Sequence, residues 1–114
     1  MSNTPIQRTL LASCPIENLP GWETRLYLID YAPGADSSGH HHPVPGVGYV
    51  VYGTILSAFA DEKPVTINAG EGFADAAHIV HTIAKNASDT QPLRFLVAYT
   101  VKQGEPVTVF PQPA

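Results

Sequence analysis

The chain is poor in cysteine and in long apolar runs. Cys14 is the only cysteine among the 114 residues, so no disulfide can form within the chain and an oxidising compartment is not required. We expect Cys14 to pack as a small apolar residue rather than to act as a nucleophile. The N-terminal part has no apolar run longer than four residues, which is too short for a secretion signal or a membrane span. These absences predict a soluble, cytoplasmic protein.

Basic residues are also scarce. Lys and Arg together number six, they do not cluster, and the formal net charge is −4. Nucleic acid is therefore not expected as a partner, because its phosphates need a basic face. Charged residues make up 14% of the chain and hydrophobic residues 44%, a balance typical of a globular protein. We expect a single domain over residues 1–114.

No stretch of the sequence shows sustained helical periodicity. The chain has 11 prolines and 9 glycines at short intervals, and the segments between them are rich in β-branched and aromatic residues. The segments predicted to be strands are residues 24–31, 48–59, 64–68, 72–75, 80–84, 93–101 and 106–110. Many short strands separated by turn residues predict an all-β sandwich or barrel.

Histidine is the residue type that suggests a function. Three of the five histidines are consecutive, at positions 40, 41 and 42, and another lies alone at position 81. In a strand alternate side chains share a face, so we expect His40 and His42 to point one way and His41 the other. Imidazole is a common ligand of divalent transition metals. His81 is the best candidate for a third ligand. The alternative is that the triplet forms a polar loop that binds nothing.

The spacing around the consecutive histidines follows a motif. Gly34 is followed by five residues and then His40, while His42 is followed by three residues and then Gly46; six more residues lead to Gly53. This pattern resembles the first motif of the cupin family, in which a glycine, two histidines, a glutamate and a second glycine recur at these intervals. One position departs from it, because Gly46 stands where the family has its glutamate ligand.

The second cupin motif is matched less fully. Gly70 opens it and His81 stands at the family's histidine position, but Ala76 and His78 replace a proline and a glycine. The two motifs cover residues 34–53 and 70–86.

The resemblance implies an antiparallel double-stranded β-helix, the cupin or jelly-roll barrel, and a homodimer. It also implies one divalent transition metal per chain (Fe, Zn, Ni or Mn), with His40, His42 and His81 as its ligands. The physical argument agrees, because a small barrel points alternate residues inward and can gather imidazoles from different strands.

The missing glutamate leaves the ligand set open. Gly46 cannot bind a metal, so either three imidazoles act alone or another carboxylate enters the site. Asp75 is the leading substitute, as ligand, as orienting group or as general base; the alternative is an aspartate that caps a turn. His78 is a second candidate, as a pocket-lining residue or acid–base group, if a turn precedes His81. In a fully extended segment His78 would face away.

Two glycines remove side chains beside the expected metal. Gly46 and Gly48 either serve turn and bulge geometry or leave room for a substrate. Alternation along the strand predicts which residues face the interior and line the pocket. They are Gly46, Gly48, Val50 and Tyr52.

Together these features predict a metal-dependent enzyme that acts on a small organic molecule. With iron, a three-histidine site would suit a dioxygenase. With zinc or a similar Lewis acid it would suit an isomerase, cyclase or lyase, with Asp75 or His78 moving protons. The alternative is a non-catalytic module that binds a small molecule or a metal without turnover.

Overall fold

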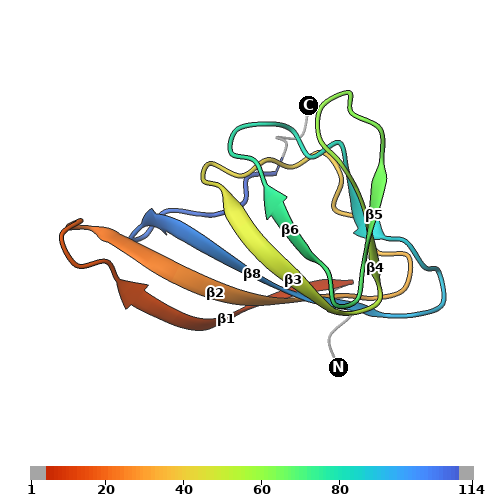
Figure 1. Ribbon diagram of the computed structural model, residues 1–114, viewed down its shortest axis with the longest axis horizontal. Coiled ribbons are helices and arrows are strands. Elements are labelled where there is room, and N and C mark those ends of the chain that lie inside the picture. Colours follow the sequence, from red (N-terminus) through yellow and green to blue (C-terminus); the bar gives the residue numbers. More distant parts are fainter. Residues whose placement is uncertain (1–4, 111–114) are drawn as a thin grey trace.

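The computed structural model describes residues 5–110, and all of their regular structure is β-strand (Figure 1). The strands within this range are β1 (Ile6–Pro15), β2 (Trp22–Tyr31), β3 (Gly46–Tyr52), β4 (Thr54–Ala58), β5 (Val65–Asn68), β6 (Gly72–Asp75), β7 (Ile83–Asn86) and β8 (Leu93–Lys102). The all-β prediction is confirmed. The described part of the chain contains no helix that could serve as a membrane span.

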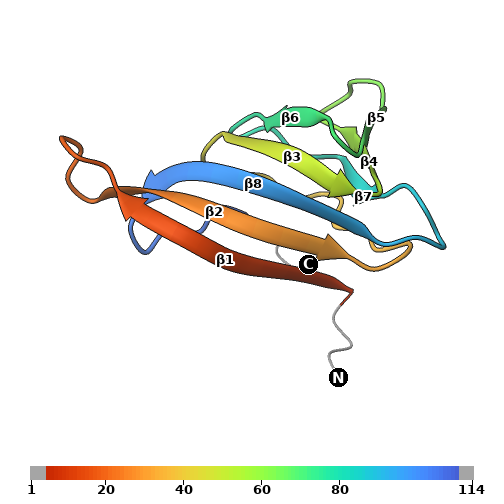
Figure 2. The ribbon, with the colours of Figure 1, turned by 60° about the horizontal axis from the view of Figure 1, so that its bottom comes forward.

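The strands form two sheets. The larger sheet has the order β1-β2-β8-β3-β6 and the smaller one the order β5-β4-β7. Their pairings are antiparallel. Figure 2 shows the larger sheet as a long curved surface, with the smaller sheet facing it at the end that carries β3 and β6. The interior between the two sheets is where alternate residues of each strand can meet.

The predicted strand 48–59 is in fact two strands that belong to different sheets. Gly53 separates β3 from β4 with a φ of +86°, in the left-handed region that favours glycine. A Cβ atom at this position would lie 2.6 Å from the carbonyl oxygen of Pro92. The chain therefore needs a glycine here to turn from the larger sheet into the smaller one.

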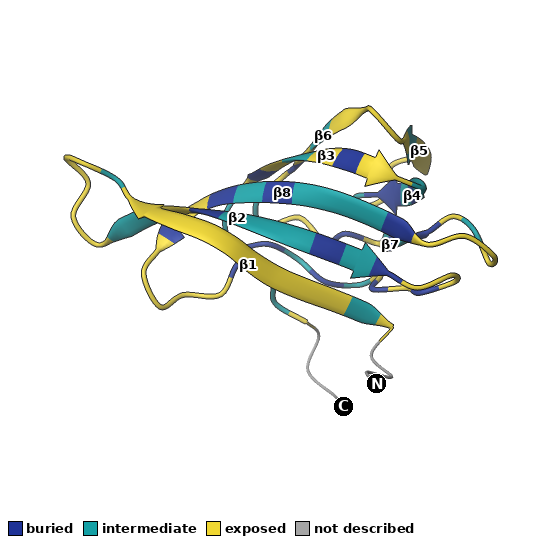
Figure 3. Ribbon diagram, turned by 90° about the horizontal axis from the view of Figure 1, so that it is seen from below, coloured by how far each residue is buried: buried dark blue, intermediate teal, exposed yellow. Residues whose placement is uncertain are grey.

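Strand β1 was not among the predicted strands. It lies at the edge of the larger sheet, and Figure 3 shows it exposed along nearly its whole length. Its strand conformation comes from pairing with β2, which local composition does not encode. Cys14 lies on this strand and is exposed, so the expectation that it packs as an apolar residue is wrong.

Two other predicted strands are displaced or absent. The segment 80–84 is replaced by β7 (Ile83–Asn86). Residues 106–110 form no strand and pair only through a single bridge between His41 and Val109. In both places the backbone forms isolated bridges with the histidine segment, His40 with His81 and His41 with Val109, and no continuous ladder.

The hydrophobic core lies between the sheets. The largest fully buried side chains are Leu93, Val97 and Val101 of β8 and Val50 of β3. Burial of each such side chain stabilises the fold by about 1.5–3 kcal/mol. Because β8 runs through the centre of the larger sheet, its inward residues set the floor of the interior.

Tyr52 does not face the interior, and that prediction is wrong. Its side chain is 40% exposed. The pairing of β3 with β8 shifts register between Val50 and Tyr52, and such an irregularity breaks the simple alternation of side chains. The Tyr52 ring instead lies on the surface beside Arg94, whose guanidinium carbon is 5.6 Å from the ring centroid.

The outer face of the larger sheet carries apolar side chains. Val47, Tyr49 and Val51 of β3 are 64%, 50% and 42% exposed, as alternation from the buried Gly46 and Val50 requires. The homodimer implied by the cupin resemblance stays a prediction, which sedimentation analysis of the purified protein would check.

Candidate metal centre

Two backbone bridges bring the distant histidines together. His81 N–H donates to the carbonyl of His40 at 2.7 Å, within an antiparallel bridge between the two residues. A second bridge joins His41 to Val109 on the other side of the same segment. Because side chains alternate along extended backbone, His40 and His42 turn inward while His41 turns away.

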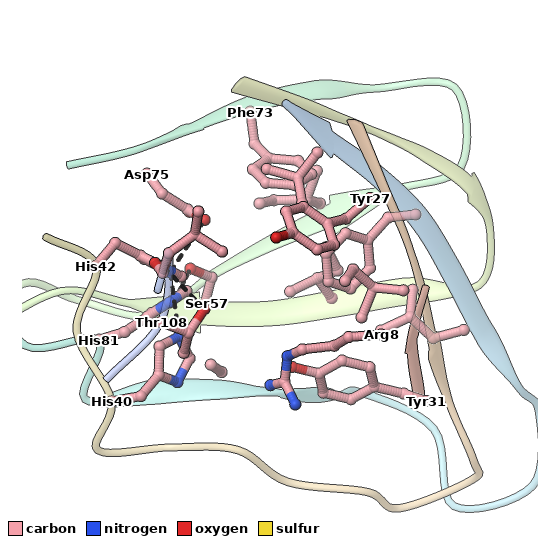
Figure 4. Close-up of a pocket in the computed structure, with 18 of the residues that line it drawn as sticks. Arg8, Tyr27, Tyr31, His40, His42, Ser57, Phe73, Asp75, His81 and Thr108 are labelled. Atoms are coloured by element: carbon pink, nitrogen blue, oxygen red, sulfur yellow. Dashed lines mark hydrogen bonds and ion pairs between the residues drawn. The ribbon is translucent and has the colours of Figure 1, made fainter. Parts of the chain in front are cut away.

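The three histidines form a buried cluster. His40 and His42 are each 4% exposed and His81 is 6% exposed. One ring nitrogen from each residue can be chosen so that all lie within 4.8 Å of one another. Figure 4 shows the three side chains gathered at one end of the pocket. This cluster could hold a metal ion.

Hydrogen bonds to the backbone orient two of the rings. His40 Nδ1 donates to the carbonyl of Ser37, and His42 Nδ1 donates to the carbonyl of Val107 at 2.8 Å. A carbonyl can only accept, so in the neutral rings these bonds leave both Nε2 atoms as lone-pair acceptors. The two Nε2 atoms lie 3.2 Å apart. Lone pairs this close repel unless a cation lies between them, and fixed Nδ1 partners are typical of metal-binding histidines.

The third ring supplies a nitrogen without a partner. His81 Nε2 and Ser57 Oγ are 2.7 Å apart. His81 Nδ1 is buried and has no hydrogen-bond partner among the described residues, a costly state unless the atom binds something. The ring stacks on Phe59 with 4.1 Å between the ring centroids. The donor set, with an orphaned nitrogen and facing lone pairs, fits a divalent ion.

Burial keeps these imidazoles neutral. It lowers the pKa of His42 to about 4 and, with the neighbouring histidines adding to the effect, the pKa of His81 to about 3. Burial also lowers the pKa of His40. A metal needs the unprotonated ring, so at neutral pH it would not have to displace protons from this cluster.

Asp75 enters the site from the strand next to Gly46. In the pairing of β3 with β6, Gly46 stands directly opposite Asp75, and paired residues point to the same face of a sheet. Asp75 is 8% exposed, and its Oδ2 lies 3.4 Å from His42 Nε2. Burial raises the pKa of Asp75 to about 7. A carboxyl group therefore reaches the histidines from a neighbouring strand, although position 46 itself carries none.

Tyr99 fills the space that Gly46 leaves. Gly46 pairs with Tyr99 on its other side, in β8. A Cβ atom at position 46 would lie 2.5 Å from Tyr99 Cε1. A Cβ at Gly48 would overlap the ring of Phe73 in the same way. The two glycines thus admit aromatic rings of the protein, and the space beside them is not left free for a substrate.

We predict that Gly46→Ala destabilises the metal-free protein by about 1–3 kcal/mol, because Tyr99 has to move. Urea unfolding of the wild type and the variant measures the difference. Gly72→Ala is the matched control, since its Cβ would approach no closer than 3.4 Å, to the carbonyl oxygen of Gly48. Equal stability of the two variants would show that the Tyr99 ring yields without cost.

His78 lies on the surface beside the site. A turn does precede His81, and His78 adopts a left-handed φ of +65° within it. Its side chain is exposed and is not among those that line the cavity. Its backbone N–H donates to the carbonyl of His42 at 2.7 Å. His78 therefore helps to hold the backbone of His42 in place.

A cavity extends from the histidines between the two sheets. Its volume is about 60 Å³, which is room for on the order of four water molecules. Most of its wall is apolar or aromatic: Tyr27, Ile29, Tyr31, Ile55, Ile67, Phe73, Leu93, Phe95, Val97, Tyr99 and Val107. Gly46, Gly48, Val50 and Tyr52, predicted from alternation, do not line it. The rings that fill the space beside the two glycines form the wall in their place.

Four polar residues of the cavity wall were missed by the sequence prediction: Arg8, Ser57, Lys85 and Thr108. Ser57 and Thr108 lie beside the histidines, and Arg8 reaches in from β1 (Figure 4). Alternation along the predicted strand 48–59 would have turned Ser57 outward, and it lines the cavity only because the chain turns at Gly53 into the second sheet. Arg8 could not have been found either, because its strand was not predicted.

The model of the family described as "Cupin domain" matches residues 27–99, which include the three histidines and Asp75. The chain belongs to the cupin family. No curated protein matches this cupin.

Solved structures share the fold of this cupin. A conserved protein with a double-stranded beta-helix domain from Klebsiella pneumoniae has a TM-score of 0.72 and 16% identity over 99% of this chain and 90% of its own. An oxalate oxidase in complex with the substrate analogue glycolate has a TM-score of 0.69 and 21% identity over 96% of this chain and 56% of its own. The DMSP lyase DddQ from Ruegeria pomeroyi has a TM-score of 0.64 and 16% identity over 76% of this chain.

This cupin spans only 42% of the length of that lyase chain. At identities of 16 to 21% the likenesses show the fold alone. They confirm the expected antiparallel double-stranded β-helix.

Proposed function

We propose that this cupin is a metal-dependent enzyme in which His40, His42 and His81 hold one divalent transition metal beside a cavity for a small organic molecule. The observation that carries the proposal is the convergence of three buried, neutral imidazoles on the wall of that cavity. Imidazole ligands suit zinc, iron and nickel. Three protein ligands leave a coordination position open, as in catalytic sites.

The reaction class that we propose is proton transfer next to a carbonyl, as an isomerase, cyclase or lyase requires. A bound divalent ion would supply Lewis-acid polarisation of the carbonyl oxygen. Within residues 5–110, Asp75 is the only carboxylate that lines the cavity. It is held beside His42 and is positioned to accept or return the proton of a bound molecule. Most of the wall around it is apolar or aromatic.

The structurally similar proteins support this proposal only through the fold that they share with this chain. One is a lyase and another an oxidase crystallised with a small organic acid, and a fold hosts many reactions. The dioxygenase expected for an iron site has no particular support from the cavity, whereas Asp75 supports acid–base chemistry.

Metal content and proton exchange test the proposal together. We expect the purified protein to bind about one zinc per chain. The zinc form should exchange the α-protons of one or more small carbonyl compounds with D2O, as followed by NMR, and the metal-free form should not. Zinc binding without exchange across a panel of small 2-oxo acids, aldehydes and ketones would favour a non-catalytic binding module. No binding of zinc, iron, nickel or manganese would contradict the metal site itself.

A further inference from the structure

Arg8 is a basic residue in an otherwise apolar part of the cavity. It lies on β1 directly opposite Ile29 of β2, and paired residues share a face. Ile29 is buried and lines the cavity. Figure 4 shows the guanidinium of Arg8 extending from β1 into the pocket, toward the side where the histidines lie.

A shared neighbour, Phe110, places Arg8 near the histidine cluster. Its guanidinium carbon lies 5.1 Å from the centroid of the Phe110 ring, and the His40 ring centroid is 6.0 Å from the same ring. Burial is the main cause of the lowered pKa of His40 and of His42, and the positive charge of Arg8 lowers both further. Arg8 and the three histidines therefore face the same cavity.

Nothing in the described part of the chain neutralises Arg8. No carboxylate of residues 5–110 lies within ion-pair distance of its guanidinium, whereas Arg25 and Arg94 each pair with an acidic residue. Lys85 is the other basic residue of the wall. It alternates with the buried Ala84 and Asn86, so its side chain lies on the other face of β7.

We propose that Arg8 binds the carboxylate of the molecule that enters this cavity, so that the site takes small organic anions with a short apolar body. A guanidinium presents paired N–H donors that match a carboxylate. The apolar walls receive the rest of the molecule, and its size is limited to a few non-hydrogen atoms by the volume of the cavity. This inference rests on the proposed function, because it names the substrate class of the same site.

The positions of Arg8 and Asp75 favour one orientation of a bound anion in the cavity. Asp75 is buried beside His42, whereas Arg8 is an exposed residue that lines the same cavity from β1. An anionic group is drawn to Arg8 and repelled by an ionised Asp75. A carboxylate held by Arg8 would leave the carbon next to it free to point toward the three histidines.

Propionate and propionamide test the inference, because they have nearly the same shape and differ in charge. Binding to the zinc-loaded and the metal-free protein is followed by two-dimensional NMR titration. We expect propionate to bind the wild type at least tenfold more tightly than propionamide. Arg8→Met should weaken the binding of propionate at least tenfold and leave the affinity for propionamide and the zinc content unchanged. Arg8→Lys should keep most of the preference for the anion.

Arg94→Met is the matched control. It removes the same charge, but Arg94 lies beside Tyr52 on the outer face of the sheet and pairs with Asp30. We expect it to bind propionate like the wild type. A wild type that does not bind propionate or does not distinguish it from propionamide, or an Arg8→Met variant with unchanged propionate affinity, would overturn the inference. Loss of zinc binding with an Arg8-dependent preference retained would overturn only the proposed function.

Discussion

Replacing His42 by alanine is expected to lower the metal content of the protein at least tenfold while the fold survives. His42 is one of three imidazoles in the cluster, and its Nε2 faces that of His40 at 3.2 Å. Each factor of ten in affinity corresponds to about 1.4 kcal/mol of binding free energy, a modest part of what one metal–imidazole bond contributes. Elemental analysis after incubation with excess zinc and desalting measures the occupancy, and circular dichroism reports the fold.

His41→Ala provides the matched control for this experiment. It removes the neighbouring imidazole from the same segment, but His41 turns away from the cluster and pairs through its backbone with Val109. We expect it to retain the zinc content of the wild type. Equal zinc content in the wild type and in His42→Ala would remove His42 from the site.

Replacing Asp75 by asparagine is expected to leave the metal bound and to slow metal-dependent proton exchange about a hundredfold. General acid–base catalysis contributes roughly 10²–10⁴-fold, and asparagine keeps the shape of the side chain without accepting a proton. The exchange rate in D2O and the zinc content are measured on the same sample. Two readouts are needed because loss of a metal ligand would lower the zinc content, whereas loss of a base would lower only the exchange rate.

Asp61→Asn is the control for the Asp75 variant. It makes the same chemical change at an exposed position in the turn that follows β4, and we expect no change in either readout. If zinc content falls together with exchange in Asp75→Asn, then Asp75 is a ligand and not a base. If neither changes, Asp75 is a structural residue of β6.

The histidine cluster could be predicted from the sequence because its determinants are local or recur at fixed intervals. Alternation along extended backbone places His40 and His42 on one face, and it does so here although the segment forms only isolated bridges. The intervals from Gly34 to Gly53 and from Gly70 to His81 carried the resemblance to cupins, which added His81 to the cluster. The structure places these three imidazoles within 4.8 Å of one another.

The surroundings of the three histidines could not be predicted in the same way. Gly46 was interpreted as a missing ligand or as room for a substrate. Strand pairing puts Asp75 on one side of it and Tyr99 on the other, and pairing partners are distant in sequence. The same holds for Tyr52, which a register shift in the β3–β8 pairing turns to the surface.

The sequence by itself determined the all-β class, the absence of an internal disulfide and the pair of inward histidines, because composition and the two-residue period of a strand act over short distances. Only the tertiary structure decided which carboxyl group meets those histidines, that Tyr99 occupies the space at Gly46, and that Arg8 reaches the cavity from an exposed edge strand. These outcomes depend on which strands become neighbours and in what register. A one-residue slip in any of these pairings would turn the side chains involved to the opposite face.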